Sequence, residues 1–134
     1  TITANGLNLE DFILTQAKIV TNTKEVLGFT VLHLFKIKFI NSTILVKYNN
    51  IVLENCIMLD SVIKAKGKQS NFLVLSLSRF EHKVKTSINS TFNNYGFVLI
   101  INCHLSKNLL FQNCNMKLFD YICRNILEKS SQQL

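Results

Sequence analysis

The sequence contains no proline and no tryptophan, and it has only four glycines in 134 residues. Collagen-like and proline-rich proteins need far more of these residues, and we expect no repeat architecture either. The longest apolar runs, such as Phe97–Ile101, fall well short of the ~18 residues that a transmembrane helix requires. Residues Thr1–Asp11 lack a basic region followed by an apolar stretch, so no secretory signal is expected.

Acidic residues and arginine are also scarce. Eight acids stand against fifteen basic residues, and the formal net charge is +7. A small basic domain indicates an anionic partner, most often nucleic acid, whereas the alternative is a surface that lysines merely solvate. Asn, Ile, Lys and Phe are abundant, which is typical of A/T-rich codons and indicates an organellar, viral or parasite genome.

Signatures of metal binding and catalysis are missing. No two cysteines are separated by the two-residue gap that is typical of zinc sites, and the three histidines do not complete a ligand set with them. The cysteines are Cys56, Cys103, Cys114 and Cys123. Gly67 lies between lysines without the glycine spacing of a phosphate-binding loop. We expect no cofactor, no metal, no small-molecule substrate and no enzymatic activity. Cys56 and Cys123 are expected to be small buried residues on helices.

Apolar spacing predicts alternating helices and strands. Residues 8–21, 43–58, 79–91 and 117–129 have helical spacing, whereas 29–40, 71–78, 97–102 and 109–112 have strand patterns. Residues 60–70 are expected to be a lysine-rich loop or short element. The predicted fold class is α+β, a single-domain α/β sandwich with a mixed, mostly antiparallel sheet flanked by helices and no internal repeat. Residues 1–115 would form an RNA-binding domain, and 116–134 a C-terminal helix with a polar tail.

Two clusters of lysines are candidate phosphate contacts. Lys36 and Lys38 alternate on the polar face of a predicted strand, beside Asn41 and Ser42 at a predicted helix N-terminus, where backbone N–H groups favour phosphate. A second cluster surrounds Gly67, which would let the backbone approach a ligand closely. The full predicted RNA-binding set is Lys18, Lys36, Lys38, Asn41, Ser42, Lys47, Lys64, Lys66, Gly67 and Lys68.

Four segments resemble, in order, the stalk-base protein of the large ribosomal subunit, known as ribosomal protein L-ten and as P-zero in the eukaryotic cytosol. They are Asn5–Phe12 with the helix to Lys18, Lys36–Leu45, Lys66-Gly67 leading into Phe72–Ser76, and Phe80–Thr91 followed by Tyr95–Asn102 and Asn108–Phe111. The resemblance spans about Asn5 to Asn115. The sequence departs from the family at Ile40, where the family has Lys, and at Lys68, where it has Pro.

The resemblance implies a structural constituent of the large ribosomal subunit. The domain would bind large-subunit rRNA at the base of the stalk, next to the L-eleven protein. It would also anchor dimers of the stalk proteins, which recruit translation factors, through Lys117–Lys129. The A/T-coded composition favours a mitochondrial ribosome, and therefore a mitochondrial location, with a cytoplasmic ribosome as the second choice. No membrane partner is expected.

A second resemblance leads to an alternative. Ser61–Lys68 with a helix after it is similar to the Alba family of nucleic-acid-binding proteins. That similarity implies a dimeric module that binds DNA or RNA. A viral or parasite accessory domain that binds other proteins is the remaining alternative.

Overall fold

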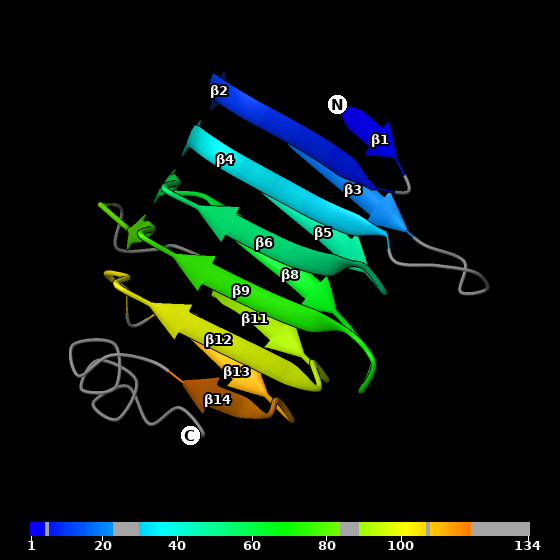
Figure 1. Cartoon of the computed structure of the whole chain (residues 1–134). Coiled ribbons are helices and arrows are strands. Elements are labelled where there is room, and N and C mark those ends of the chain that lie inside the picture. The colour runs from blue at the N-terminus through cyan, green and yellow to red at the C-terminus, as the bar shows by residue number, and fades with distance from the viewer. Residues whose placement is uncertain (5, 23–29, 84–88, 107, 119–134) are drawn as a thin grey trace.

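The computed structural model describes residues 1–4, 6–22, 30–83, 89–106 and 108–118, and these form a parallel β-solenoid (Figure 1). The chain winds in successive coils, each of which adds one strand to a sheet at the back and one to a sheet at the front of the view. The expected α+β sandwich is wrong, because the described residues contain no helix. The expected mostly antiparallel pairing is also wrong, since every strand pairing among the described residues is parallel.

One face of the solenoid, which we call sheet A, is built from short strands that follow one another coil by coil. Its strands, in spatial order, are β1 (Ile2–Ala4), β3 (Lys18–Asn22), β5 (Thr43–Lys47), β8 (Val62–Lys66), β11 (Ser90–Asn93) and β13 (Leu109–Gln112). Their pairing is in register, so that equivalent positions stack, as Ile19, Ile44 and Ile63 do. A given side chain therefore lies between its counterparts in the coils before and after it.

The opposite face, sheet B, contains the longer strands and bends partway along them. It comprises β2 (Leu7–Thr15), β4 (Val31–Ile40), β6 (Asn50–Glu54), β9 (Phe72–Ser76), β12 (Phe97–Ile101) and β14 (Met116–Leu118), with β7 (Ile57–Leu59) and β10 (Arg79–Glu81) beyond the bend. The first half of β4 pairs with β6 and its second half with β7. Beyond the bend the sheet forms a short third face.

Alternating apolar side chains from both sheets fill the space between them. Successive residues of a strand point to opposite faces, so every second residue is buried. Leu32, Leu34, Ile51 and Leu53 are at most 1% exposed. Burying one such side chain stabilises the fold by about 1.5–3 kcal/mol, and stacked coils supply many of them.

At the corners between strands the backbone adopts a left-handed conformation. Three columns of positive φ run along the solenoid, and their members are Asp11, Lys36, Asn55, Leu77 and Asn102, then Gln16, Asn41 and Asp60, then Tyr48, Asn94 and Asn113. Asn and Asp tolerate this conformation better than other non-glycine residues because their short side chains can hydrogen-bond locally. Asparagine therefore takes the place of glycine at many corners, and this is why four glycines suffice.

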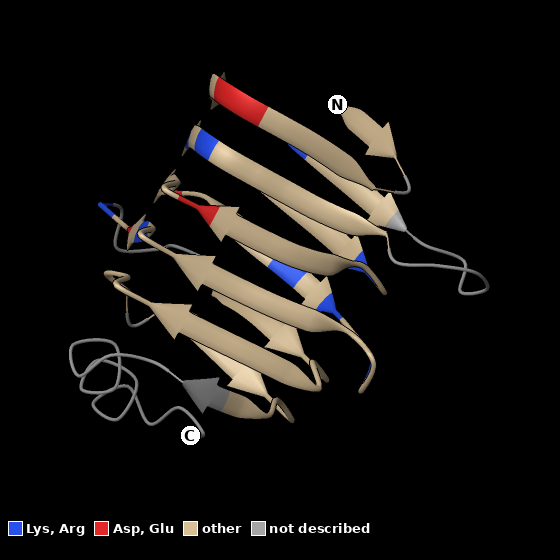
Figure 2. Ribbon diagram, viewed as in Figure 1, with Lys and Arg blue, Asp and Glu red and all other residues tan. Residues whose placement is uncertain are grey.

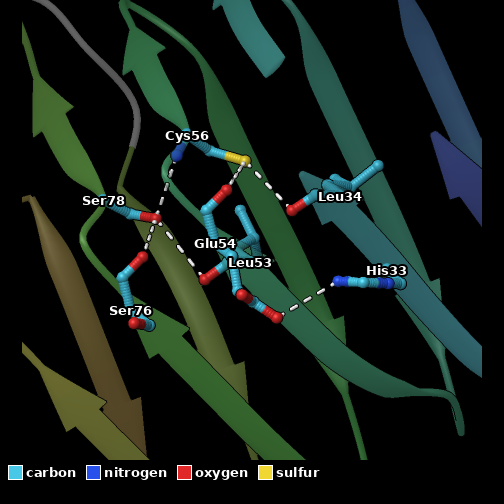
Figure 3. A network of polar contacts seen from close by, with 7 residues as sticks. All are labelled: His33, Leu34, Leu53, Glu54, Cys56, Ser76 and Ser78. Carbon is cyan, nitrogen blue, oxygen red and sulfur yellow. Dashed lines mark hydrogen bonds and ion pairs between the residues drawn. The ribbon is translucent and has the colours of Figure 1, made fainter. Parts of the chain in front are cut away.

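The residue after many corners is a Ser or Cys that closes the turn, and it is buried at each position below except Cys114, which is partly buried. Its Oγ or Sγ donates a hydrogen bond to the carbonyl two residues earlier, at 2.9–3.4 Å, in Ser42, Cys56, Ser61, Ser78, Cys103 and Cys114. These side chains also link coils. The Cys56 thiol reaches the Leu34 carbonyl at 3.2 Å, and the Cys56 N–H donates to Ser78 Oγ at 3.2 Å (Figure 3).

The repeat that these corners form was not expected from the sequence, so the prediction of no repeat architecture is wrong. An apolar residue, any residue, an Asn and then a Ser or Cys occur at Phe39–Ser42, Leu53–Cys56, Ile100–Cys103 and Phe111–Cys114. Bonded corner residues in adjacent coils are 19, 22 or 25 residues apart. This uneven spacing conceals the period.

The predicted strands are confirmed and the predicted helices are wrong wherever the structure describes them. Strand predictions at 29–40, 71–78, 97–102 and 109–112 correspond to β4, β9, β12 and β13. The predicted helix at 43–58 is three strands, and of the two possibilities for 60–70, a loop or a short element, the structure has a short strand, β8. The predicted helices at 8–21, 79–91 and 117–129 contain strands where they are described, and 84–88 and 119–134 lie outside the described residues. Cys56 is buried as predicted, although at a corner, and Cys123 is not described.

Candidate anion-binding face

The outer surface of sheet A carries four of the ten predicted RNA-binding residues. Lys18 lies on β3, Lys47 on β5, and Lys64 and Lys66 on β8, and all four side chains are exposed. The register places Lys47 beside Lys66 on the neighbouring strand. Adjacent strands are about 4.8 Å apart, so these two lysines form a continuous pair across coils.

No acidic side chain offsets this charge on the same sheet. The described strands of sheet A contain neither Asp nor Glu. The acids that the structure describes lie on sheet B, on its third face or at a corner, and they are Glu10, Asp11, Glu54, Asp60 and Glu81 (Figure 2). The described strands of sheet A are therefore purely basic, whereas sheet B and its third face carry charges of both signs, and this difference favours the approach of an anion to sheet A.

A groove of about 410 Å³ lies among these lysines. The side chains that line it from the outer face are Val20, Leu45, Lys47, Lys64, Lys66, Thr91 and Asn93. Register aligns Val20 with Leu45 and then with Lys64 and Thr91. Val20 and Leu45 therefore form an apolar pair beside the ammonium groups of the three lysines. The Thr91 hydroxyl and the Asn93 amide lie on the far side, on β11. This arrangement can hold an anion that also carries an apolar surface.

Two other predicted residues lie where the backbone leaves β8. The Lys68 ammonium is 4.8 Å from the centre of the Tyr48 ring, which is a favourable cation–π distance. Gly67 is buried, and a Cβ placed there would be 2.8 Å from the Tyr95 ring. The absence of a side chain at Gly67 thus makes room for the Tyr95 ring. The sequence had instead indicated that it would let the backbone approach a ligand.

Lys36 and Lys38 belong to a different surface. Both lie on β4, with Lys36 at the bend of sheet B and Lys38 beyond it, where its neighbour across the sheet is Ile57. The Lys36 ammonium is 5.1 Å from the centre of the Phe35 ring. On the same third face Arg79 is paired with Glu81 at 2.6 Å. The structure therefore separates the two predicted lysine clusters.

Asn41 and Ser42 do not begin a helix. Asn41 is an exposed left-handed corner residue with φ of 49°, and its N–H donates to the Leu59 carbonyl. Ser42 is 2% exposed, and its Oγ accepts a hydrogen bond from the Ala17 N–H at 3.1 Å. The predicted phosphate site at a helix N-terminus is therefore absent, and Ser42 is part of the interior.

Sequence reasoning missed the groove because it assigned 60–70 to a loop or an unspecified short element and placed Thr91 in a helix. Val20, Leu45, Thr91 and Asn93 were not predicted to line a site. The signal that could have located them is the period-two pattern of Val62–Lys66, in which lysines alternate with buried residues as they do on a half-buried strand.

The titratable groups with clear shifts are structural. Burial raises the pKa of the Cys56 and Cys114 thiols, and burial together with the nearby Cys114 raises the pKa of the Tyr95 hydroxyl. That hydroxyl donates to the Asn49 carbonyl at 3.2 Å. Within the described ranges no three His, Cys, Asp or Glu side chains are grouped so that they could hold a metal ion. None of the described segments forms an apolar helix of membrane-spanning length.

No family model, no curated protein and no solved structure matches this chain.

Proposed function

We propose that this chain is a non-enzymatic RNA-binding protein that holds RNA against the outer face of sheet A. The observation that carries the proposal is the joint presence of Lys47, Lys64 and Lys66 around one groove, on a sheet whose described strands contain no acidic residue. Lysines attract phosphates and release their counterions, which supplies affinity without reading sequence. A rigid stack of coils holds the positions of these lysines fixed relative to one another.

Charge reversal on the two lysine clusters tests this proposal. The first variant combines Lys47→Glu, Lys64→Glu and Lys66→Glu, and the matched control combines Lys36→Glu and Lys38→Glu. Binding of a fluorescent RNA oligonucleotide is measured by anisotropy at low salt, with far-UV circular dichroism to confirm that both variants fold. We expect the first variant to lose at least about 100-fold in affinity and the control to change less than about 3-fold. Equal losses in both variants would overturn the assignment of the face.

We further propose that the RNA is ribosomal RNA of the large subunit, in a mitochondrial ribosome. Two observations support this: the order of the four segments that resemble the stalk-base family, and the A/T-coded composition. The helices that this resemblance implies at 8–21 and 43–58 are strands, so a shared fold does not support the proposal. The L-eleven protein and stalk-protein dimers would be neighbours, the latter through a segment of which only Lys117 and Leu118 are described.

Sedimentation of a native lysate tests the ribosomal part of the proposal separately. The protein is followed by mass spectrometry through sucrose gradients at low and moderate salt. We expect it to migrate with the large subunit and to stay there at moderate salt. Migration at the top of the gradient would contradict the ribosomal proposal, and a free dimer there would favour the Alba-like alternative.

A further inference from the structure

We infer that the groove on sheet A takes one unpaired nucleotide of a single-stranded nucleic acid. In this arrangement Val20 and Leu45 contact the base or sugar, and Lys47, Lys64 and Lys66 contact the flanking phosphates. The inference rests on the proposed function and goes further, because it specifies a single strand and a seat for one nucleotide. A groove of about 410 Å³ lies within the ~300–1,000 Å³ range of small-ligand sites.

The spacing of the lysines supports contacts to a chain and not to a lone anion. Lys64 and Lys66 are two residues apart on β8, which separates them by about 6.6 Å along the strand. Lys47 is the register neighbour of Lys66 on β5, about 4.8 Å away. The three lysines therefore lie on two adjacent strands that line the groove, and an extended nucleic-acid strand can place successive phosphates beside them.

The apolar part of the groove favours an unpaired base over a duplex. Leu45 is the register neighbour of Lys64, and Val20 is the next residue along the same column. In a duplex the base faces are covered by stacking, so only phosphates and groove edges could reach this surface. A single strand can turn a base face or a sugar toward Leu45 and Val20. Thr91 and Asn93 offer hydroxyl and amide groups that can reach a base edge or a 2′-hydroxyl.

Comparing the affinities of the intact chain for three polyanions tests the inference. The probes are a single-stranded RNA oligonucleotide, a duplex RNA of the same length, and heparin as a polyanion without bases. The variants are Leu45→Ala and Val20→Ala, and the matched control is Leu110→Ala, which lies on the same column of sheet A but does not line the groove. Circular dichroism confirms that each variant folds.

We expect the unmodified protein to bind the single strand about 10-fold tighter than the duplex. Leu45→Ala or Val20→Ala should weaken single-strand binding about 5-fold, because each removes part of the apolar surface that a base or sugar would cover. Heparin binding should not change in any of these variants, and Leu110→Ala should leave all three affinities unchanged.

The outcomes separate this inference from the proposed function. Equal affinity for single strand, duplex and heparin, with no effect of the Leu45 and Val20 variants, would overturn the nucleotide seat and leave an RNA-binding lysine face. Binding of heparin alone, or of no polyanion, would overturn both.

Discussion

Replacing Ser61 by alanine should destabilise the solenoid by about 2 kcal/mol. Ser61 is fully buried at the corner between β7 and β8. Its Oγ accepts a hydrogen bond from the Ser42 N–H at 3.0 Å, and it donates one to the Leu59 carbonyl at 2.9 Å. The substitution therefore removes both a link within one corner and a link between two coils.

The magnitude follows from the group that is left without a partner. A buried N–H that loses its acceptor costs about 1–3 kcal/mol, whereas the second hydrogen bond contributes about 1 kcal/mol net. The Leu59 carbonyl loses a donor but retains a second lone pair, so the first loss dominates. Part of the cost is offset because the alanine methyl buries no polar atom. Ser61→Cys should recover part of the loss, because Cys56 makes the same bond to the carbonyl two residues earlier at another corner.

Urea unfolding followed by circular dichroism measures this change in the free energy of unfolding. Ser70→Ala is the control, because Ser70 is exposed in a turn, and it should change the free energy by less than about 0.5 kcal/mol. A change below about 0.5 kcal/mol for Ser61→Ala, with an unchanged m-value, would refute the reasoning that corner hydroxyls join the coils.

Three further predictions concern the backbone and the buried titratable groups. Leu77→Asn should stabilise the protein by about 1 kcal/mol in urea unfolding, because Leu77 has a φ of 52° and is 58% exposed at a corner where neighbouring coils carry Asn. A loss of stability would contradict it. Gly96→Ala should lower the free energy of unfolding by about 3 kcal/mol or more, because the alanine Cβ would collide with the Gln69 carbonyl. A urea midpoint near that of the unmodified protein would contradict this prediction and show that the turn can move to accept a Cβ. Burial raises the folded-state pKa of Cys56 and Tyr95 above their ordinary values of 9.0 and 10.0. The unfolded chain therefore loses these protons at a lower pH than the folded chain does. The free energy of unfolding keeps its full value below pH 9, and it should fall as pH rises above 9 and fall further above 10. Thermal melts at pH 8, 9.5 and 10.5 test the order, and equal midpoints would contradict it.

The strands that the sequence predicted correctly are those with an uninterrupted pattern. β4 alternates apolar and polar residues over Phe35–Phe39, and β12 is a continuous apolar run. In β4 the apolar residues Ile37 and Phe39 are the buried ones, whereas in β12 only alternate residues of the apolar run are buried. The left-handed corner at Lys36 leaves the alternation in β4 intact, so a period of two still indicates a strand there.

The predicted helix at 43–58 fails because corners change the spacing of buried residues. Ile44 and Val46 are buried on β5, Ile51 and Leu53 on β6, and Met58 on β7. Each corner shifts the period by one residue or more, and the summed spacing resembles the 3.6-residue repeat of a helix. The information that distinguishes the two is the contact with adjacent coils, which a single segment of sequence does not contain.

The candidate site was predictable in part. Lys47, Lys64 and Lys66 were selected from charge alone, and the structure brings them together because in-register coils stack β5 on β8. Lys36 and Lys38 were selected by the same reasoning, but the bend in sheet B directs them elsewhere. Which lysines share a face depends on coil register, and register depends on the corners.

The salt dependence of RNA affinity tests the central claim most directly. Log affinity for single-stranded RNA falls with log salt by about 0.7 per phosphate contact. Three groove lysines therefore predict a slope of about −2 for the unmodified protein, again about −2 for the Lys36→Gln, Lys38→Gln double variant, and near zero when Lys47, Lys64 and Lys66 are all changed to Gln. A slope that survives loss of the three groove lysines would contradict the claim that these lysines hold the RNA on sheet A.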